Sequence, residues 1–340
     1  MLQNIPLSNY STMKLGGKAA YFLEVNTQAA LVEAASNAKN YNIPLLVIGG
    51  GSNIIWRDEG FPGLVIVNRI GGFEVASQDD FGTYITVGAG ENWDSVVERS
   101  VGLGLSGIEC LSLIPGTAGA TPIQNVGAYG QEIARSLVTV TAYDLEEGKM
   151  VTLPAADCSF SYRSSIFKTT SKGRYQITAI TLLLTKNPPM PPFYPSLANY
   201  LEQHAIKQYS PAVLRDAVCA IRRSKLPDPL VTPNCGSFFA NPLVDPSLLS
   251  ALEEHYAAVP HWDGGNGQIK LSAAWLIEKA GFADYYDEET GIATWPQQPL
   301  VFVNRSAKAT TDLLKFADMV SAKVKEMFSV DLVREPELLP

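Results

Sequence analysis

Cysteine and histidine are scarce in this sequence, and neither is spaced to bind a metal ion. Four cysteines and three histidines are spread over 340 residues, at Cys110, Cys158, Cys219, Cys235, His204, His255 and His261. No two cysteines have the C-x-x-C spacing typical of zinc sites, so we expect no metal site. Small buried thiols are the simplest interpretation of the cysteines.

An excess of positive charge and long apolar runs are also missing. The formal net charge of −8 argues against a nucleic-acid partner, which would require a basic surface. No apolar run reaches the ~18 residues of a membrane span, and the first residues, MLQNIPLSNYSTM, lack the basic and apolar segments of a signal peptide. We therefore expect a cytoplasmic protein without a membrane partner, and we predict no obligate protein partner.

What is present is typical of a globular α+β protein. Hydrophobic residues make up 46% and charged residues 18%, which suits a chain with a large core. Apolar patterns and end signals predict helices at residues 27–40, 92–103, 211–224, 272–280 and 308–328. Strands are expected at residues 20–25, 44–48, 64–68, 84–87, 138–143, 148–153, 177–184 and 299–304. The proline-rich segment 187–192 is typical of a linker.

The last of these helices has the clearest amphipathic pattern. Its apolar residues recur at helical spacing, and we expect all of them to be buried: Leu313, Phe316, Ala317, Val320, Val324 and Met327.

Residues 113–130, LIPGTAGATPIQNVGAYG, form the most unusual stretch of the chain. They include four glycines but no lysine or arginine. Glycine permits positive φ and leaves the main-chain N–H groups bare, so such a run can approach a ligand closely. Successive N–H groups can then form a concave nest for anionic oxygens. The alternative is a turn-rich connector that binds nothing.

Two more glycine-rich segments precede this stretch. Residues 49–53, GGGSN, follow a predicted strand, and residues 88–90, GAG, follow another. The first is not a G-x-G-x-x-G fingerprint, because an apolar segment rather than a helix comes next. A tight turn would explain one such segment alone. Three of them in one half of the chain favour a long dinucleotide, which requires several close main-chain approaches.

Polar candidates for catalysis lie outside these segments. Arg163, within FSYRSSIF, could present a planar fork to a carboxylate, although stacking at the surface is an alternative. Arg222 and Lys225, just before LPDP, could bind a diphosphate or simply end a solvated helix. Ser237 lies between a glycine and two phenylalanines, without the G-x-S-x-G pattern of a hydrolase. Carboxylates flank Pro336, where a solvated tail is the alternative.

These segments, taken in order, resemble one protein family. NYSTMKLGG, IPGTAGATPIQNVGAYG, SYRSSIF, KLPDP, CGSFFANP and EPEL are similar to the UDP-N-acetylenolpyruvoylglucosamine reductases, flavoenzymes of cell-wall precursor synthesis. The resemblance runs from about residue 9 to residue 337. It implies an FAD-binding half of the vanillyl-alcohol-oxidase (PCMH) type in two α+β subdomains, followed by a substrate-binding α+β domain. We assign these to residues 1–70, 71–187 and 188–340.

The resemblance also implies the cofactors. FAD is expected to be bound without a covalent link, and NADPH is expected to be the reductant. The residues expected to contact FAD all lie in the glycine-rich segments: Gly49, Gly50, Gly51, Ser52, Asn53, Gly88, Ile114, Pro115, Gly116, Thr117, Gly119, Ala120, Gln124, Asn125, Gly127, Ala128, Tyr129 and Gly130.

The catalytic assignments come from the same resemblance. Arg163 matches the family's catalytic arginine, Ser237 its proton donor and Glu337 its catalytic glutamate. Because only three residues follow Glu337, we expect it to be loosely held and keep Glu335 as the alternative. The residues expected to contact the UDP-sugar are Tyr162, Tyr194, Arg222, Lys225 and Asn241. Of these, Tyr194 matches the tyrosine that closes over the substrate in the larger subclass of the family.

The implied reaction adds a hydride from flavin N5 and a proton from Ser237 across the enolpyruvyl double bond. The chain has no Rossmann fingerprint for a second nucleotide, so we expect NADPH to use the substrate pocket in a ping-pong order. Two alternatives stay open. One is another FAD-dependent oxidase or dehydrogenase of the same superfold, in which Cys110 or Cys158 could tether the flavin. The other is a nucleotide-sugar binder without flavin.

Overall fold

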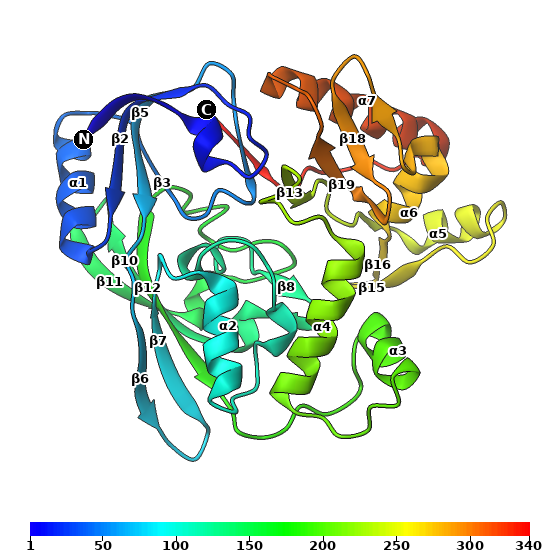
Figure 1. Ribbon diagram of the computed structural model, residues 1–340, viewed down its shortest axis with the longest axis horizontal. Helices are drawn as coiled ribbons and strands as arrows, with labels where there is room; N and C mark the ends of the chain where they lie inside the picture. Colours follow the sequence, from blue (N-terminus) through cyan, green and yellow to red (C-terminus); the bar gives the residue numbers. More distant parts are fainter. The chain divides into compact units, whose positions relative to one another are not determined.

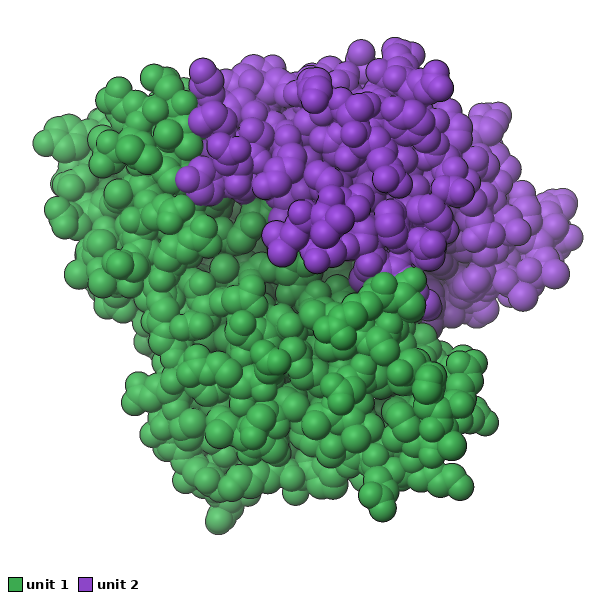
Figure 2. Space-filling view, viewed as in Figure 1, with its two compact units in different colours: residues 1–5, 19–51, 61–224 green, residues 6–18, 52–60, 225–340 purple.

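The computed structural model describes residues 1–340, which form two compact units (Figure 2). Unit 1 comprises residues 1–5, 19–51 and 61–224, and unit 2 comprises residues 6–18, 52–60 and 225–340. The chain passes several times from one unit to the other, so each unit combines segments that are distant in sequence. The sequence predicted three domains, with boundaries at residues 70 and 187. The contacts within the chain define two units, so that three-domain division remains a prediction.

The first sheet of unit 1 is built around a short parallel crossover. Its strand order is β1-β2-β5-β3, with β2 and β3 both parallel to β5. The strands are β1 (Leu2–Pro6), β2 (Lys18–Val25), β5 (Phe61–Asn68) and β3 (Leu45–Ile48). Helix α1 (Gln28–Asn40) connects β2 to β3 and begins as predicted, because the Thr27 hydroxyl accepts the N–H of Ala30.

The second sheet of unit 1 is antiparallel and larger. Its order is β11-β10-β12-β7-β6. The strands are β6 (Phe73–Gln78), β7 (Thr83–Gly88), β10 (Leu137–Asp144), β11 (Lys149–Pro154) and β12 (Tyr175–Leu184). Helix α2 (Trp93–Gly102) packs its buried residues into the same core cluster as β7, β10 and β12. The Asn92 side chain caps this helix by accepting the N–H of Ser95.

Two further helices complete unit 1 (Figure 1). Helix α4 (Pro211–Lys225) follows the prediction, whereas α3 (Pro195–Gln203) was not predicted. The nine residues of α3 come directly after the proline-rich segment, which hides the start of the helix. Leu197 and Leu201 of α3 are buried against Leu214 and Val218 of α4.

Unit 2 contains two antiparallel sheets and three α-helices. The four-stranded sheet has the order β13-β19-β18-β17 and the three-stranded sheet the order β14-β16-β15. The strands are β13 (Asn234–Ser237), β14 (Leu243–Val244), β15 (His261–Gly265), β16 (Gln268–Leu271), β17 (Tyr286–Asp287), β18 (Ile292–Trp295) and β19 (Gln298–Asn304). The helices are α5 (Pro246–Glu253), α6 (Ala273–Ile277) and α7 (Thr310–Phe328).

The core of unit 2 is aromatic. Phe302 stacks on Phe238 with ring centroids 4.6 Å apart and meets Phe316 of α7 edge-on at 4.9 Å. The predicted stripe of α7 is buried except for Met327, which is 39% exposed. That part of the prediction was wrong, because the stripe continues four residues beyond Val324, to the buried Phe328.

The end of the chain is paired rather than solvated. Strand β20 (Glu337–Leu339) runs parallel to β4 (Ile54–Trp56), and the N–H of Glu337 donates to the carbonyl of Asn53 at 3.1 Å. Just before it, Arg334 forms an antiparallel bridge with Phe239. The expectation of a loosely held Glu337 is therefore wrong, and the alternative of a solvated tail does not apply. Separately, no helix in the structure is both long enough and apolar enough to cross a membrane.

Candidate functional site

The central glycine-rich loop, residues 113–130, is fixed to the segment that leads into α2. The N–H of Trp93 donates to the carbonyl of Gly116 at 3.1 Å, and the N–H of Ala118 donates to Glu91 at 2.9 Å. The N–H of Gly119 donates to the carbonyl of Ala89 at 2.9 Å. The loop is therefore an ordered part of unit 1, not a free connector.

Three glycines are required where the glycine-rich segments touch. A Cβ atom on Gly49 would lie 2.2 Å from the Thr117 hydroxyl oxygen. One on Gly50 would lie 3.0 Å from the Cα atom of Gly116, and one on Gly119 would lie 2.5 Å from the Cβ atom of Ala89. Each added methyl would force a neighbouring atom to move, so these glycines allow the segments to pack closely.

A cavity of about 90 Å³ opens beside these contacts within unit 1. Its walls come from the ends of β3 and β5, from β12 and from the central loop, and include Gly49, Asn68, Thr117, Gly119 and Tyr175. Whole ligand sites usually measure ~300–1,000 Å³, so this cavity can hold one part of a dinucleotide.

The chemistry of the cavity suits a diphosphate ester such as FAD. No lysine or arginine lines it. The main-chain N–H of Thr117, which lines the cavity, donates to no acceptor within the chain, and neither do those of Gly50 and Gly116, which adjoin the lining residues Gly49 and Thr117. Bare amides of this kind can bind anionic oxygens through their dipoles. The residues present therefore fit the cofactor expected from the glycine-rich segments.

A covalent flavin link through Cys110 or Cys158 does not fit the structure. Both thiols are buried and make no disulfide. Burial raises the pKa of Cys110 to about 12 and that of Cys158 to about 11. The thiolate is the reactive form of cysteine, so neither side chain is a ready nucleophile.

Asn125 organises the second half of the central loop. It has a positive φ of 47°, and its side chain is almost completely buried. The side-chain N–H groups of Asn125 donate to Glu132 at 2.9 Å and to the carbonyl of Ser161 at 3.1 Å, and its side-chain oxygen accepts the N–H of Ala134 at 3.2 Å. These bonds give Asn125 a structural role beside the FAD contact that we predict for it.

Arg163 is held in a tight turn against the same loop. Ser161 and Ser164 bridge across the turn, and Arg163 between them has a φ of 54°. Its Nη1 donates to the carbonyl of Gly127 at 3.1 Å, and its guanidinium lies 5.5 Å from the centre of the Tyr162 ring. A non-glycine residue with positive φ costs roughly 1–3 kcal/mol, and such strain clusters at functional sites.

Arg222 of α4 lies near both ends of the central loop. Its Nη2 donates to the carbonyl of Leu113 at 3.2 Å, and its positive charge lies close enough to Tyr129 to act on the pKa of that phenol. The Tyr129 ring meets Tyr194 edge-on at 6.0 Å, so two predicted substrate residues lie close to the loop. The Nε of Arg222 is buried and has no acceptor in the chain, which suits a group that binds an anionic ligand.

The remaining candidates lie in unit 2. Ser237 ends β13 and is half-buried, and the N–H of Glu335 donates to the carbonyl of the next residue, Phe238, at 3.0 Å. The CGSFFANP and REPE segments are therefore neighbours. Asn241 uses its side-chain oxygen to accept the N–H of Ala273 at 3.0 Å, at the start of α6, and Lys225 is exposed.

The predicted site residues thus fall into two sets. Unit 1 holds most of the expected FAD contacts, together with Tyr162, Arg163, Tyr194 and Arg222. Unit 2 holds the others: Ser52, Asn53, Lys225, Ser237, Asn241, Glu335 and Glu337. Within each unit several of them are neighbours, and their roles remain predictions.

Sequence reasoning missed several polar residues beside the loop and the cavity. Asp94 and Arg215 form an ion pair next to Leu113, while Asn68 and Tyr175 line the cavity. One signal was available: Arg215 and Arg222 are seven residues apart on a predicted helix and therefore share a face. Nothing in the sequence links that face to Asp94.

The fold and the site together define an FAD-binding flavoprotein of the α+β type. A family model described as an FAD binding domain matches residues 19–154, and one described as the UDP-N-acetylenolpyruvoylglucosamine reductase C-terminal domain matches residues 228–339. The chain belongs to the UDP-N-acetylenolpyruvoylglucosamine reductase family, as its nearly full-length relatives show.

Two such relatives carry that enzyme's name. The protein from Thermobifida fusca is 41% identical over 99% of this chain and 97% of its own length. The protein from Amoebophilus asiaticus is 39% identical over 99% of this chain and 98% of its own length. The crystal structure of UDP-N-acetylenolpyruvylglucosamine reductase from Thermus caldophilus is 24% identical, with a TM-score of 0.67 over 99% of this chain and 98% of that one. The expected fold class is confirmed.

Proposed function

We propose that this chain reduces the enolpyruvyl group of UDP-N-acetylenolpyruvoylglucosamine to give UDP-N-acetylmuramate, a step in peptidoglycan precursor synthesis, with FAD as cofactor and NADPH as reductant. The observation that carries the proposal is the match, 36–41% identical along nearly the whole chain, to proteins with this enzyme's name. The glycine-lined cavity of unit 1 supports it, because the bare amides in and next to the cavity suit a diphosphate ester.

Arg163 is proposed to bind the carboxylate of the enolpyruvyl group. When FAD is bound, its reduced flavin supplies the hydride for the double bond. Negative charge then builds on the carboxylate side of the substrate, and a fixed guanidinium can stabilise it. Preorganised donors of this kind contribute about 3–4 kcal/mol each to lowering the barrier. The hydrogen bond from Arg163 to Gly127 and its tight turn support this role, because they fix the guanidinium before the substrate arrives.

Ser237 is proposed to donate the proton to the substrate carbon, and Glu337 to act beside it. A serine hydroxyl is a weak acid, so we expect a cation such as Lys225 or a water chain to resupply its proton. The pairing of β20 with β4 fixes the main chain of Glu337 and supports its proposed role.

The UDP part of the substrate is proposed to meet Arg222 and Lys225, with Tyr162, Tyr194 and Asn241 as further contacts. The buried, unpartnered Nε of Arg222 supports its role as an anion ligand. Because UDP-sugars and NADPH are cytoplasmic metabolites, the proposed reaction places the chain in the cytoplasm.

An absorbance spectrum of the purified protein tests the cofactor directly. We expect flavin bands from the protein and a free yellow supernatant after acid precipitation. NADPH oxidation is then measured with and without the enolpyruvyl UDP-sugar, and we expect sustained turnover only when the sugar is present. A protein that binds no added FAD, or that turns over NADPH equally without the sugar, would contradict the proposal.

Ser237→Ala separates the two half-reactions. Reduction of the flavin by NADPH should remain fast, whereas its reoxidation by the substrate should slow by about 10²-fold or more, as expected when a general acid is lost. Ser250→Ala is the matched control, at an exposed serine of α5 whose hydroxyl donates to the carbonyl of Pro246. If reoxidation survives in Ser237→Ala, another group donates the proton.

The order of substrates gives a second kinetic test. A pocket shared by NADPH and the sugar nucleotide predicts parallel lines in double-reciprocal plots of initial rate. Intersecting lines would show that both bind at once and would disprove the shared pocket.

A further inference from the structure

Leu113, the first residue of the central loop, has a conformation that its own side chain disfavours. Its φ is 54°, in the left-handed region where a β-carbon causes crowding. Such residues persist only where the surroundings hold them. Leu113 directly precedes Ile114, Pro115 and Gly116, which we predict to contact FAD. Whatever holds Leu113 therefore sets the course of the loop.

Two charged side chains hold the peptide groups of Leu113 from opposite sides. The N–H of Leu113 donates to Oδ1 of Asp94 at 2.6 Å. Its carbonyl accepts Nη2 of Arg222 at 3.2 Å. Hydrogen bonds to charged groups are stronger than those between neutral groups.

Asp94 is in turn oriented by Arg215. Nη1 of Arg215 donates to Oδ1 at 2.6 Å, and Nη2 donates to Oδ2 at 3.1 Å. This fork fixes the plane of the carboxylate, as a single lysine ammonium could not. Burial alone would raise the pKa of Asp94, but the hydrogen bonds from Arg215 and Leu113 outweigh it and lower the pKa, so the carboxylate is ionised at neutral pH.

Helix α4 supplies both arginines from one face. Arg215 and Arg222 are seven residues apart, and its buried residues include Leu214 and Val218, which anchor the helix. Asp94 belongs to the first turn of α2, and the ion pair joins the two helices, which are labelled in Figure 1. The segment entering α2 also forms main-chain hydrogen bonds to the loop at Gly116 and Ala118. The bond from Leu113 to Asp94 is therefore one of several that attach the loop to this segment.

We propose that the Asp94–Arg215 pair is a positioning device for the cofactor: it orients the carboxylate that holds Leu113, and so sets how tightly FAD is retained by the loop. The inference rests on the proposed function, since it assumes that the loop binds FAD. Neither residue needs to touch the cofactor. Their effect passes through the main chain of residues 113–117.

FAD release from the full-length holoprotein tests the inference. The protein is diluted, and the rise in flavin fluorescence gives the rate of release. For Asp94→Asn and for Arg215→Ala we expect release about tenfold faster than in the unaltered protein, the effect of losing one charge-assisted hydrogen bond. Arg215→Lys keeps the charge but loses the fork. We expect its rate of FAD release to lie between that of the unaltered protein and that of Arg215→Ala.

Glu98→Gln is the matched control, because Glu98 lies one turn along α2 and reaches Arg215 only at 3.9 Å from an exposed position. We expect its release rate to be unchanged. Thermal unfolding of each protein stripped of FAD separates positioning from loss of fold. Faster release with a Tm within about 3 °C of the unaltered protein supports the inference.

The outcomes distinguish the two proposals. If the unaltered protein takes up no FAD, the proposed function fails. If it binds FAD and the Asp94 and Arg215 variants release it at the unaltered rate, the positioning role is disproved while the proposed function stands. Equal acceleration in Glu98→Gln would also disprove it, because the effect would then be one of surface charge.

Discussion

Unit 1 contains two bidentate arginine–aspartate pairs in different surroundings. Asp94 is bound by the Arg215 fork, and Asp144 receives two nitrogens of Arg174, the shorter bond being 2.6 Å in each pair. In both cases the hydrogen bonds outweigh burial and hold the pKa of the carboxyl below its usual value. Each pair thus joins one guanidinium to one carboxylate of lowered pKa.

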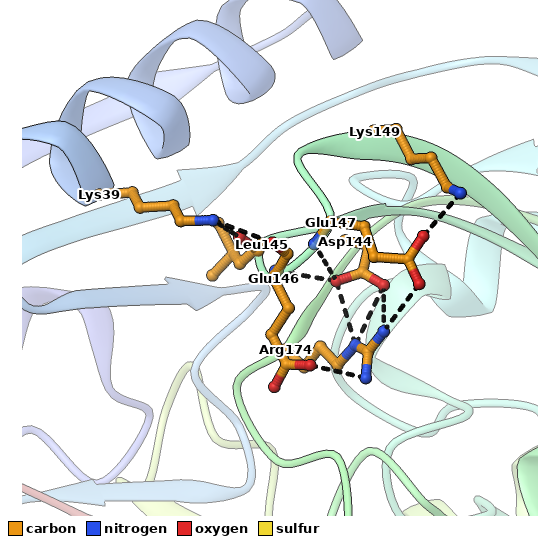
Figure 3. A network of polar contacts seen from close by, with 7 residues as sticks. All are labelled: Lys39, Asp144, Leu145, Glu146, Glu147, Lys149 and Arg174. Carbon is orange, nitrogen blue, oxygen red and sulfur yellow. Dashed lines mark hydrogen bonds and ion pairs between the residues drawn. The ribbon is translucent and has the colours of Figure 1, made fainter.

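What differs is the main chain that each aspartate holds. Asp94 accepts the N–H of Leu113, in the loop assigned to the cofactor. Asp144 accepts the N–H groups of Glu146 and Glu147, in the turn between β10 and β11, as Figure 3 shows. Arg174 also reaches both of these glutamates. The role of such a pair is thus decided by the segment that it orients and not by its own chemistry.

Helix α1 joins the second network from outside the sheet. Nζ of Lys39 donates to the carbonyl of Leu145 and, at 3.1 Å, to that of Glu146 (Figure 3). The same helix reaches β10 through a 2.8 Å hydrogen bond between the hydroxyls of Ser36 and Tyr143. The network therefore fastens the two sheets of unit 1 to each other, which is a task of stability.

Asp144→Asn should have the largest effect on folding. Its side chain is only 1% exposed, and an amide cannot replace the carboxylate opposite Arg174. Breaking a buried pair usually costs 3–5 kcal/mol, and we expect about 2 kcal/mol here because the arginine is partly screened by solvent. Urea unfolding measures the loss, and FAD release should change less than twofold. Faster FAD release from Asp144→Asn with an unchanged free energy of unfolding would show that this pair, and not only Asp94–Arg215, acts on the cofactor.

Gly119→Ala tests whether the other anchors of the central loop matter as the Asp94 anchor does. The new methyl would lie 2.5 Å from the Cβ atom of Ala89, so the loop must move. We expect a loss of about 1–2 kcal/mol, the usual cost of overpacking, together with faster FAD release. Thermal unfolding and flavin fluorescence provide the measurements. Unchanged release would show that the loop tolerates displacement at this point.

Acid should remove the contribution of Asp144. Because Arg174 lowers the pKa of this carboxyl below 3.8 in the folded state, its stabilisation is fully present above about pH 5 and is lost as the pH falls through the unfolded and then the folded pKa. The gap in Tm between the unaltered protein and Asp144→Asn should therefore be constant from pH 7 to pH 5 and narrow progressively at lower pH. A gap that widens in acid would contradict the assigned direction of the pKa shift.

Lys39→Ala should have the smallest effect. Lys39 is exposed, and it donates to neutral carbonyls at the rim of the network. We expect a loss of no more than about 0.5 kcal/mol, as for most surface substitutions. Urea unfolding of Lys39→Ala and Asp144→Asn under the same conditions checks this. If both variants lost the same free energy of unfolding, the β10–β11 hairpin would be held by α1 and not by Arg174.

Much of the local structure could be predicted from the sequence. The Thr27 and Asn92 caps begin α1 and α2 where expected, and the apolar stripe locates α7. Strand β6 was missed because five of its six residues are exposed, so no apolar pattern marks it. Helix α3 was missed because of the prolines before it.

The candidate site divides in the same way. The glycine-rich segments and the family motifs are short stretches of consecutive residues. The class of cofactor and the proposed reaction could therefore be inferred from the sequence without coordinates. The partners of these segments could not. Asp94 meets Arg215 across 121 positions of sequence, and Glu337 pairs beside Asn53 near the other end of the chain.

By itself, the sequence determined where the chain turns, which helix faces are apolar and where main chain is bare enough to approach a ligand. These properties depend on residues a few positions apart. Only the tertiary structure decided which carboxylate holds Leu113, which one closes a hairpin, and that the last strand lies beside β4. Hydrogen bonds act over about 3 Å, and which groups come that close is known only once the whole chain has packed.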